Sequence, residues 1–444
     1  MAERAQLRKI KAQEENQLKE LLKCMNHFVK SFRSNLHTID DPRHQSYTKY
    51  KMAELLMTVV LKNLCNVESM REMTKEFNTN ETIKNFQMIF DKAEIDEIPH
   101  YVTVNDTLKK LENKALEQIR KDMIKEIIRR KTFNKGRLLD SKWKVIFDAT
   151  YLYSFGKRHC EHCLTQTFNR DTEDEITVYS HKVLEAKIVL SEDIVISIGT
   201  EFVENEGENV TKQDSELKAF KRLSEKVKND FPRLPICMLA DSLYAAKPVM
   251  DICKSYDWDY VIRFKDGSIP TLAKEFEALL SLSDQEKNTN NKNINCVNAI
   301  DYRKTKVSIF TFETINISDE GVEIKIKFKW ITNIEVTDKN VEELADTGRD
   351  RWKIENEGFN TQKNLRYNIT HANSLNYNAM KNHYLITQIA DIILQLFTAS
   401  NQMVKILKKS IKKISSDLLK WLTTTILSKD DIFYSQKRTT IHFI

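Results

Sequence analysis

The chain has 444 residues, a net charge of +6, 41% hydrophobic residues and 30% charged residues, which is typical of a globular protein with two or three domains. It has only 8 glycines, and no two have the spacing of a dinucleotide-binding turn or a phosphate-binding P-loop. The longest apolar run, 385–397, is interrupted by polar residues and is too short to span a bilayer. These properties exclude both nucleotide-binding motifs and a membrane-spanning helix.

The ends of the chain are basic and its middle is acidic. Residues 1–140 carry 27 basic and 21 acidic side chains, residues 401–444 carry 9 and 3, and residues 141–400 carry 34 and 40. Such a distribution suits a protein that holds a polyanion with its flanks, although lysine-rich helices can also be plain solvated surface. The charged N-terminus does not resemble a signal peptide, and the seven cysteines are expected to be reduced, so we expect a cytoplasmic protein.

The predicted elements change from helical to mixed at residue 142. Apolar residues recur at helical spacing over 54–64 and 107–128, so residues 1–140 are predicted to be helical. The following elements are strands at 143–151, 186–190 and 194–202, then helices at 215–231, 245–256 and 269–280 that alternate with strands at 235–241 and 259–264. Three antiparallel strands followed by strand–helix–strand units predict a ribonuclease-H-like α/β fold.

The second half contains a β-rich insertion between helices. Residues 282–298 are polar and are predicted to be a loop, while alternating residues over 304–313 and 322–332 predict two strands. Helix is expected from residue 340 and through most of 350–415.

Three acidic residues lie where this fold would place a reaction site. Asp148 ends the first strand, Asp241 ends the strand after the first helix, and Glu355 lies on a helix after the insertion. Carboxyl ends of neighbouring strands meet at one crevice, and carboxylates bind Mg²⁺. Two such ions can clamp the attacking and leaving oxygens of a phosphodiester. Taken singly, an aspartate at a strand end is more often a helix cap, so the prediction depends on all three.

Four segments around these acids resemble motifs of one family: DAT at 148–150, KQDSELKAFKRL at 212–223, ADSLYA at 240–245 and RWKIENEGFNTQKN at 351–364. They are similar to those of DDE transposases of bacterial insertion sequences, in the branch with a β-strand insertion before the catalytic glutamate. The resemblance implies that Asp148, Asp241 and Glu355 are catalytic and bind Mg²⁺, for which Mn²⁺ can substitute.

The last segment departs from the family pattern at two positions. That branch has Tyr-x2-Arg-x3-Glu-x6-Lys, and Arg351 and Glu355 keep the Arg-x3-Glu spacing. The tyrosine position falls on Gly348, and the lysine position falls on Gln362, with Lys363 one residue later.

On an α-helix, a mixed set of residues around Glu355 would share one face: Arg351, Glu355, Phe359, Gln362 or Lys363, and Arg366. The cations Arg351, Lys363 and Arg366 are therefore predicted to bind DNA phosphates next to Glu355, the predicted metal ligand. The alternative is an exposed, ion-paired helix.

Three further residues are predicted to contact DNA. The resemblance implies that Trp330, on a strand of the insertion, stacks on an extruded base, whereas the residue pattern alone favours a buried strand tryptophan. Arg129 and Arg130 begin a basic run beside the expected domain boundary, where they could guide a DNA end toward Asp148.

A compact Cys-x2-Cys pair, Cys160 and Cys163, lies among histidines. Such a pair begins many zinc sites, but no second pair completes it. Two interpretations stay open: a structural zinc held by these cysteines with His181 and either His159 or His162, and two reduced thiols packed in a loop.

We therefore predict four regions: a helical DNA-end-binding region at 1–140, a ribonuclease-H-like catalytic domain at 141–281 and 336–400, a β-rich insertion at 282–335, and a basic helical region at 401–444. The resemblance implies an enzyme that binds terminal inverted repeats and target DNA, acts as a homodimer in the synaptic complex, and cuts and joins DNA. Two alternatives stay open: a structure-specific nuclease of the same fold, and a non-cutting DNA-binding protein derived from a transposase.

Overall fold

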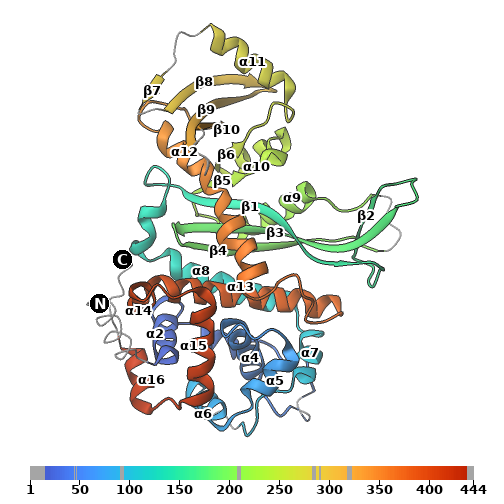
Figure 1. The fold of residues 1–444 in the computed structure, drawn as a ribbon, viewed down its shortest axis with the longest axis vertical. Helices are drawn as coiled ribbons and strands as arrows, with labels where there is room; N and C mark the ends of the chain where they lie inside the picture. Colours follow the sequence, from blue (N-terminus) through green and yellow to red (C-terminus); the bar gives the residue numbers. More distant parts are fainter. Residues whose placement is uncertain are drawn as a thin grey trace.

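The computed structural model describes residues 16–44, 46, 48–90, 95–207, 212–282, 287–289, 292–317 and 323–437. A ten-stranded sheet crosses the molecule, with helices below it and along its faces (Figure 1). Its strands are β1 (Trp143–Phe155), β2 (Leu164–Phe168), β3 (Ile176–Ser191), β4 (Ile194–Val203), β5 (Ile236–Ala240), β6 (Asp259–Arg263), β7 (Lys287–Thr289), β8 (Lys292–Tyr302), β9 (Thr305–Ile317) and β10 (Glu323–Thr332).

The centre of the sheet has the predicted ribonuclease-H-like order. β3 pairs antiparallel with both β1 and β4, whereas β1, β5 and β6 pair in parallel. The intervening helices are α9 (Glu216–Asp230), α10 (Lys247–Tyr256) and α11 (Pro270–Ser281). The predicted α/β fold class is therefore confirmed.

The inserted strands continue this sheet. β10 pairs antiparallel with β6, and β9, β8 and β7 follow outward from it. The loop prediction for 282–298 is wrong at β7 and again from residue 292, where β8 begins. The asparagines of this segment disfavour a strand. However, buried Ile294 and Ile300 pair with Phe312 and Val307 of β9, so cross-strand packing overrides the local composition.

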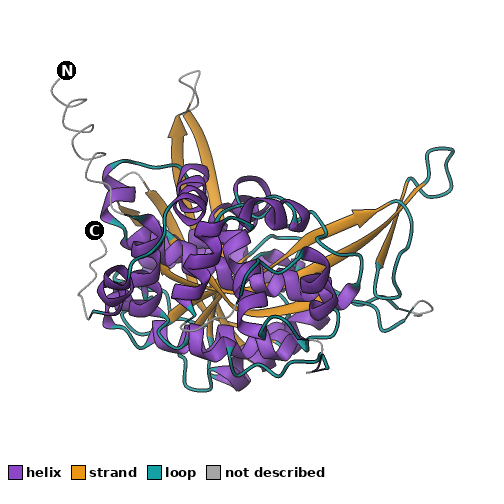
Figure 2. Ribbon diagram, turned by 90° about the horizontal axis from the view of Figure 1, so that it is seen from below, coloured by secondary structure: helices purple, strands orange, loops and turns teal. Residues whose placement is uncertain are grey.

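A β-arm projects beside the sheet and was only partly predicted. It consists of β2, the outer part of β3 and the end of β1 (Figure 2). The segment 176–185 and β2 both contain β-branched and aromatic residues that favour strands, so this part of the arm could have been predicted.

The N-terminal region is helical, as predicted. Its helices are α2 (Gln17–Phe28), α3 (Phe32–Leu36), α4 (Met52–Leu64), α5 (Met70–Phe77), α6 (Asn80–Ile89), α7 (Tyr101–Leu108) and α8 (Asn113–Ile128), with a 3-10 helix at Lys131–Gly136. After the sheet come α12 (Val341–Asp350), a π-helix (Ile354–Leu365), α13 (Tyr377–Ser400), α14 (Gln402–Ile406), α15 (Ile411–Thr424) and α16 (Lys429–Gln436). No helix in the described part of the chain is long and apolar enough to cross a membrane.

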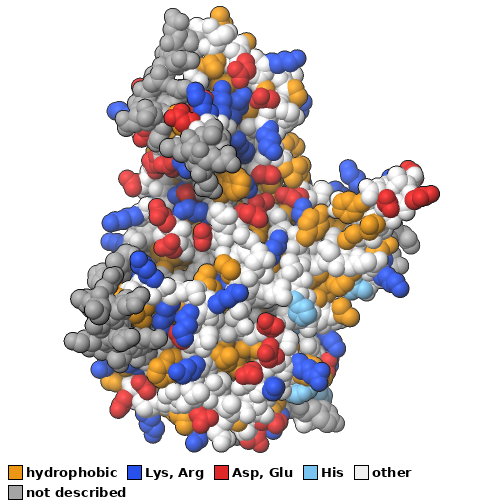
Figure 3. Space-filling view, in the orientation of Figure 1, with side chains coloured by type: hydrophobic (Ala, Val, Ile, Leu, Met, Phe, Trp, Pro, Cys, Tyr) orange, Lys and Arg blue, Asp and Glu red, His pale blue; other side chains and the backbone are white. Residues whose placement is uncertain are grey.

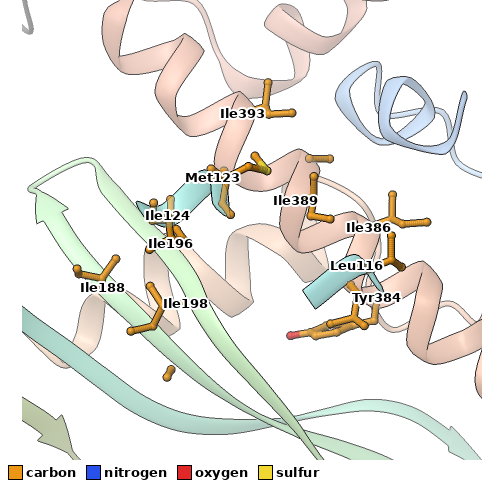
Figure 4. Close-up of a cluster of buried hydrophobic side chains, with 14 of the residues drawn as sticks. Leu116, Met123, Ile124, Ile188, Ile196, Ile198, Tyr384, Ile386, Ile389 and Ile393 are labelled. Atoms are coloured by element: carbon orange, nitrogen blue, oxygen red, sulfur yellow. The ribbon is translucent and has the colours of Figure 1, made fainter. Parts of the chain in front are cut away.

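Helix α13 joins the N-terminal helices to the sheet through one core. It packs against α4, α8 and β4. Figure 4 shows Met123 of α8, Ile196 of β4 and Ile389 of α13 in one apolar cluster. The expected boundaries near residues 140 and 400 therefore do not separate independent cores, because the buried cluster runs through α2, the sheet and α15.

Candidate active site

Asp148 and Asp241 lie at the same level on neighbouring parallel strands. β1 and β5 are in register up to the pair Ile146–Leu239, and each aspartate is two residues beyond its member of that pair. Asp241 caps the 3-10 helix Ser242–Tyr244 by accepting a 2.9 Å hydrogen bond from the Leu243 amide. The parallel register thus brings together two carboxylates that are 93 positions apart in the numbering of the chain.

The surroundings of Asp148 oppose its ionisation. Burial raises the pKa of its carboxyl to about 6, and the negative charges of Asp241 and Glu216 add to this effect. The guanidinium of Arg351 opposes it, with a 3.2 Å contact between Arg351 Nη1 and Asp148 Oδ2. Like charges near a half-buried carboxyl favour the binding of either a proton or a cation, so this site has the electrostatics of a cation-binding position.

Glu355 lies on a helix that packs on the sheet. It lies in the first turn of the π-helix Ile354–Leu365, which contacts β1 and β4. Arg351, four residues before Glu355, makes the contact with Asp148 described above. Among the described residues, the three acids do not form one group that could hold a metal ion, and the side chain of Glu355 is exposed.

The helix of Glu355 is a π-helix rather than the predicted α-helix. Its hydrogen bonds span five residues, as in the 2.8 Å bond from the Arg366 amide to the carbonyl five residues earlier. The wider turn changes the angle between successive side chains, so the predicted common face does not exist. Glu355 is exposed, whereas Phe359, Gln362 and Arg366 are buried.

The three predicted DNA-contacting cations of this segment have different surroundings. Arg351 contacts Asp148, and Lys363 is partly exposed. Arg366 is buried and forms a 3.1 Å ion pair with Asp391 of α13. Arg366 therefore stabilises the core under the π-helix, and the prediction that it contacts DNA is corrected.

Trp330 is also buried, in contrast to its predicted role in base stacking. Only 1% of its surface is exposed, and its ring stacks on Phe310 and Phe328. A Cβ atom at Gly348 would lie less than 3 Å from three atoms of the indole ring. The indole thus fills the space next to the position where the family pattern has tyrosine, which explains the glycine there.

Arg129 and Arg130 follow α8 but differ in exposure. Arg129 is exposed, whereas Arg130 is partly buried over the ring of Phe28 and hydrogen-bonds to His27 of α2 at 3.1 Å. Arg130 is therefore occupied in packing α8 against α2, and Arg129 is the better placed of the two for contact with DNA.

Two charged residues near Asp148 were not singled out in the sequence. Glu216, in the first turn of α9, accepts hydrogen bonds from Tyr244 Oη at 2.8 Å and Lys182 Nζ at 2.5 Å. Arg263 ends β6, and burial together with the charge of Arg351 lowers its pKa. Glu216 lies in the family-like segment 212–223, and Arg263 ends the third parallel strand, so both could have been found from their positions.

A cleft of about 1240 Å³ lies beside the candidate site. Its lining includes five basic side chains, from the 3-10 helix after α8, β1, α12 and the residues after α12: Lys131, Lys135, Lys144, Arg349 and Lys353. Glu192, Asp346 and Asp350 also line it, so its charge is only moderately positive. On the face of the molecule in Figure 3, basic and acidic side chains are likewise interspersed, with lysines and arginines gathered over the inserted strands.

One exposed aromatic residue lines this cleft. Trp352 is 53% exposed, and the guanidinium of Arg351 lies 5.1 Å from the centre of its ring. Lys144, which lines the cleft, lies on the same face of β1 as Asp148. The two positions are four residues apart, which is roughly 13 Å along the strand. The cleft therefore offers cations and an aromatic face on the side of the molecule that also carries Asp148.

Comparison with known families agrees with this geometry. Residues 195–390 match the model of the transposase DDE domain, and residues 33–123 match the model of a domain described as DDE_Tnp_1-associated. The two matches together cover well over half of the chain, and the first includes Asp241 and Glu355 but begins after Asp148. The chain belongs to the DDE transposases. No curated protein matches it.

Proposed function

We propose that this transposase binds the terminal inverted repeats of its own element, cleaves DNA at those ends and joins them to target DNA. The observation that carries the proposal is the arrangement of Asp148 and Asp241 at one level of the sheet, with Arg351, four residues before Glu355, in contact with Asp148. We further propose that the element is a bacterial insertion sequence of the branch with inserted strands, because the inserted β-strands precede Glu355.

The donor set of the site fits Mg²⁺ or Mn²⁺. Asp148, Asp241 and Glu355 offer only carboxylate oxygens, which hard divalent cations prefer. Burial is the main cause of the raised pKa of Asp148, and the negative charges of Asp241 and Glu216, which a bound cation would neutralise, add to it. When bound, such ions activate water or a 3′-hydroxyl for attack and stabilise charge on the phosphodiester.

The residues of the chain bind and orient the DNA. Arg351 limits the rise in the pKa of Asp148, and the partly exposed Lys363 and the exposed Arg129 would contact phosphates. Lys131 and Lys135 line the cleft that leads toward Asp148, and we propose Trp352 in place of Trp330 as the residue that stacks on an exposed base.

We propose two kinds of partner. The first is double-stranded DNA, which includes the transposon ends and the target DNA, and the second is another copy of the chain in the synaptic complex. Cleavage of both ends by one assembly needs two active sites, which a homodimer supplies. The protein would act in the cytoplasm, where the DNA of a bacterial cell lies.

The test uses the purified full-length chain and labelled DNA that ends in the terminal repeat of the element. Binding, nicking and joining to a plasmid target are measured side by side, with Mg²⁺ or Mn²⁺. The variants Asp148→Asn, Asp241→Asn and Glu355→Gln should bind the ends but neither nick nor join them. Glu357→Gln, an exposed acid two residues after Glu355, is the matched control and should retain activity.

Each failure of this test points to a named alternative. Wild-type protein that nicks but does not join DNA would be a nuclease of the same fold. Wild-type protein that binds the ends without nicking them would be a non-cutting descendant of a transposase. Nicking that survives Glu355→Gln would remove that residue from the site.

A further inference from the structure

Four metal-binding side chains converge where the β-arm joins the catalytic sheet. They come from the turn after β1 and from β3, and their ligand atoms all lie within 4.8 Å of one another: His159, Cys160, Cys163 and His181. This is a different group from the acids of the candidate active site, and Cys163 and His181 are buried.

Four of the six distances between ligand atoms in this cluster match the edges of a tetrahedron around one metal ion, and all six are within 4.8 Å. The two Sγ atoms are 3.3 Å apart, and His181 Nε2 lies 3.4 Å from Cys160 Sγ and 3.6 Å from Cys163 Sγ. Cys163 Sγ lies 3.6 Å from His159 Nδ1. Zinc bonds of about 2.3 Å to sulfur and about 2.0 Å to nitrogen give tetrahedral edges of roughly 3.5 Å. Both cysteines are free thiols, so they are available as ligands.

The neighbouring histidine is held elsewhere. His162 Nδ1 donates a hydrogen bond to the Asn205 carbonyl at 2.8 Å, and its ring stacks on Tyr377 at 4.5 Å. The structure therefore resolves the choice that the sequence leaves open, since His159 faces the sulfur atoms and His162 does not.

The position of the cluster connects it to the catalytic strand. His181 of β3 is paired with Tyr153 of β1, and four residues further along β3 Glu185 is paired with Asp148. The turn is also anchored by Asn205, which donates to the Cys163 carbonyl at 2.9 Å. A bond from this turn to His181 would hold β1 and β3 in register roughly 14 Å from Asp148.

We propose that His159, Cys160, Cys163 and His181 bind one structural Zn²⁺ ion, which fixes the base of the β-arm and the pairing of β1 with β3. All four positions are filled by protein ligands, which is the arrangement of a structural rather than a catalytic zinc. The proposal concerns a thiolate and imidazole site, and it does not depend on the oxygen-ligand site for Mg²⁺.

The first test is the metal content of the full-length protein, purified without chelators and measured by plasma mass spectrometry. We expect one zinc ion per chain, reduced to background in Cys163→Ser and in His181→Asn. His162→Asn and Cys253→Ser are the controls and should keep full zinc, because the first lies beside the cluster and the second is a buried thiol of α10. His159→Asn should lower zinc retention during dialysis, whereas His162→Asn should not.

The second test replaces zinc with Co²⁺ and reads the visible spectrum. Two thiolates and two imidazoles in a tetrahedron should give intense ligand-field and sulfur-to-cobalt bands, which Cys160→Ser should shift because one sulfur ligand is lost. Removal of zinc by a chelator should increase proteolysis within 156–181 while leaving the helical region intact.

Absence of zinc from protein reconstituted with excess Zn²⁺, or full zinc in Cys163→Ser, would overturn the proposal. So would a disulfide between Cys160 and Cys163 in freshly purified protein. If Cys163→Ser fails to fold, the Co²⁺ spectrum of wild-type protein decides the question, because an octahedral spectrum would exclude a thiolate site.

Discussion

Arg351 Nη1 lies 3.2 Å from Asp148 Oδ2, so the helix that leads to Glu355 is tied directly to the strand that carries the first aspartate. The contact also sets the charge of the site. Burial raises the pKa of Asp148 to about 6 from an ordinary 3.8, and Arg351 limits this rise. In the metal-free protein the carboxyl is therefore largely protonated below about pH 6 and ionised above it.

The first prediction concerns the pH dependence of metal binding. Proton and cation compete for Asp148, so Mn²⁺ affinity should fall about tenfold per pH unit below pH 6 if one proton is displaced. Arg351→Gln removes the charge that lowers the pKa of Asp148, so the midpoint of this dependence should move to higher pH. Titration of Mn²⁺ by its electron paramagnetic resonance signal at several pH values measures both.

The control for this prediction is Asp148→Asn, which should bind Mn²⁺ more weakly and lose the pH step near 6. The same midpoint in wild-type protein and Arg351→Gln would show that the ion pair does not set the ionisation of Asp148.

The raised pKa of Asp148 in the folded protein also affects stability. Metal-free protein should lose stability as pH rises from about 4 to 6, because over this range the folded state binds more protons than the unfolded state.

The second prediction concerns the buried charges under the π-helix. Asp391 pairs with Arg366 at 3.1 Å and with Lys187 at 4.0 Å, and it accepts 2.8 Å hydrogen bonds from Gln362 and Gln395. Asp391→Ala would leave two buried cations without their anion. We expect a loss of about 3–5 kcal/mol in the free energy of unfolding, measured by urea denaturation.

A matched control is Asp96→Ala, which removes an acid from an exposed ion pair with Lys49. Water already solvates that pair, so the unfolding midpoint should hardly change. Equal midpoints for Asp391→Ala and Asp96→Ala would mean that water enters the buried network around Asp391. That network would then contribute nothing to the stability of the π-helix.

The positions of Asp148 and Asp241 could be predicted from the sequence because strand order alone determines them. Two hydrophobic runs that form neighbouring parallel strands must bring their carboxyl ends together, whatever the side-chain details. The surroundings of Arg366 could not be predicted in this way. The prediction assumed 3.6 residues per turn, but the segment forms a π-helix, whose stability depends on buried partners such as Asp391 that lie far away in the sequence.

The burial of Trp330 was the alternative that its residue pattern favoured, and the family resemblance pointed the other way. Period-two alternation along β10 places it on the inner face of the sheet with Phe328 and Phe310 nearby. The exposure of Trp352 gave no sequence signal, because one tryptophan on a polar helix is compatible with either burial or exposure.

The third prediction tests the packing of Gly348 against Trp330. Gly348→Ala should destabilise the protein by about 1–3 kcal/mol, because the added Cβ overlaps the indole ring. Trp330→Phe should also destabilise it by leaving a gap. In the double variant the smaller ring leaves room for the methyl group, so its loss should be less than the sum of the single losses. Strictly additive losses in urea denaturation would show that the two sites relax independently.

The fourth prediction concerns residues 1–140 on their own. α8 and α4 pack against α13, so a fragment ending at residue 140 would expose the apolar surface that α13 covers. We expect the fragment to aggregate or to melt without a cooperative transition, followed by circular dichroism. A soluble fragment with a sharp melting transition would show that the region predicted to bind DNA ends folds independently of α13.

The last prediction assigns the stacking role to Trp352. Its ring is 53% exposed in the cleft and lies against Arg351, which itself contacts Asp148, so a base at the end of a DNA strand could stack there while its phosphate approaches the acids. Stacking on an aromatic side chain contributes about 1–3 kcal/mol per base, so Trp352→Ala should weaken the binding of DNA with an unpaired terminal base by roughly tenfold or more. Affinity for a fully paired end should change less, because its terminal bases stay stacked within the duplex. Phe433→Ala, which removes an aromatic ring that is 63% exposed on α16, is the matched control and should leave both affinities unchanged. An equal loss for paired and unpaired ends would assign Trp352 to the general shape of the cleft instead of to base stacking.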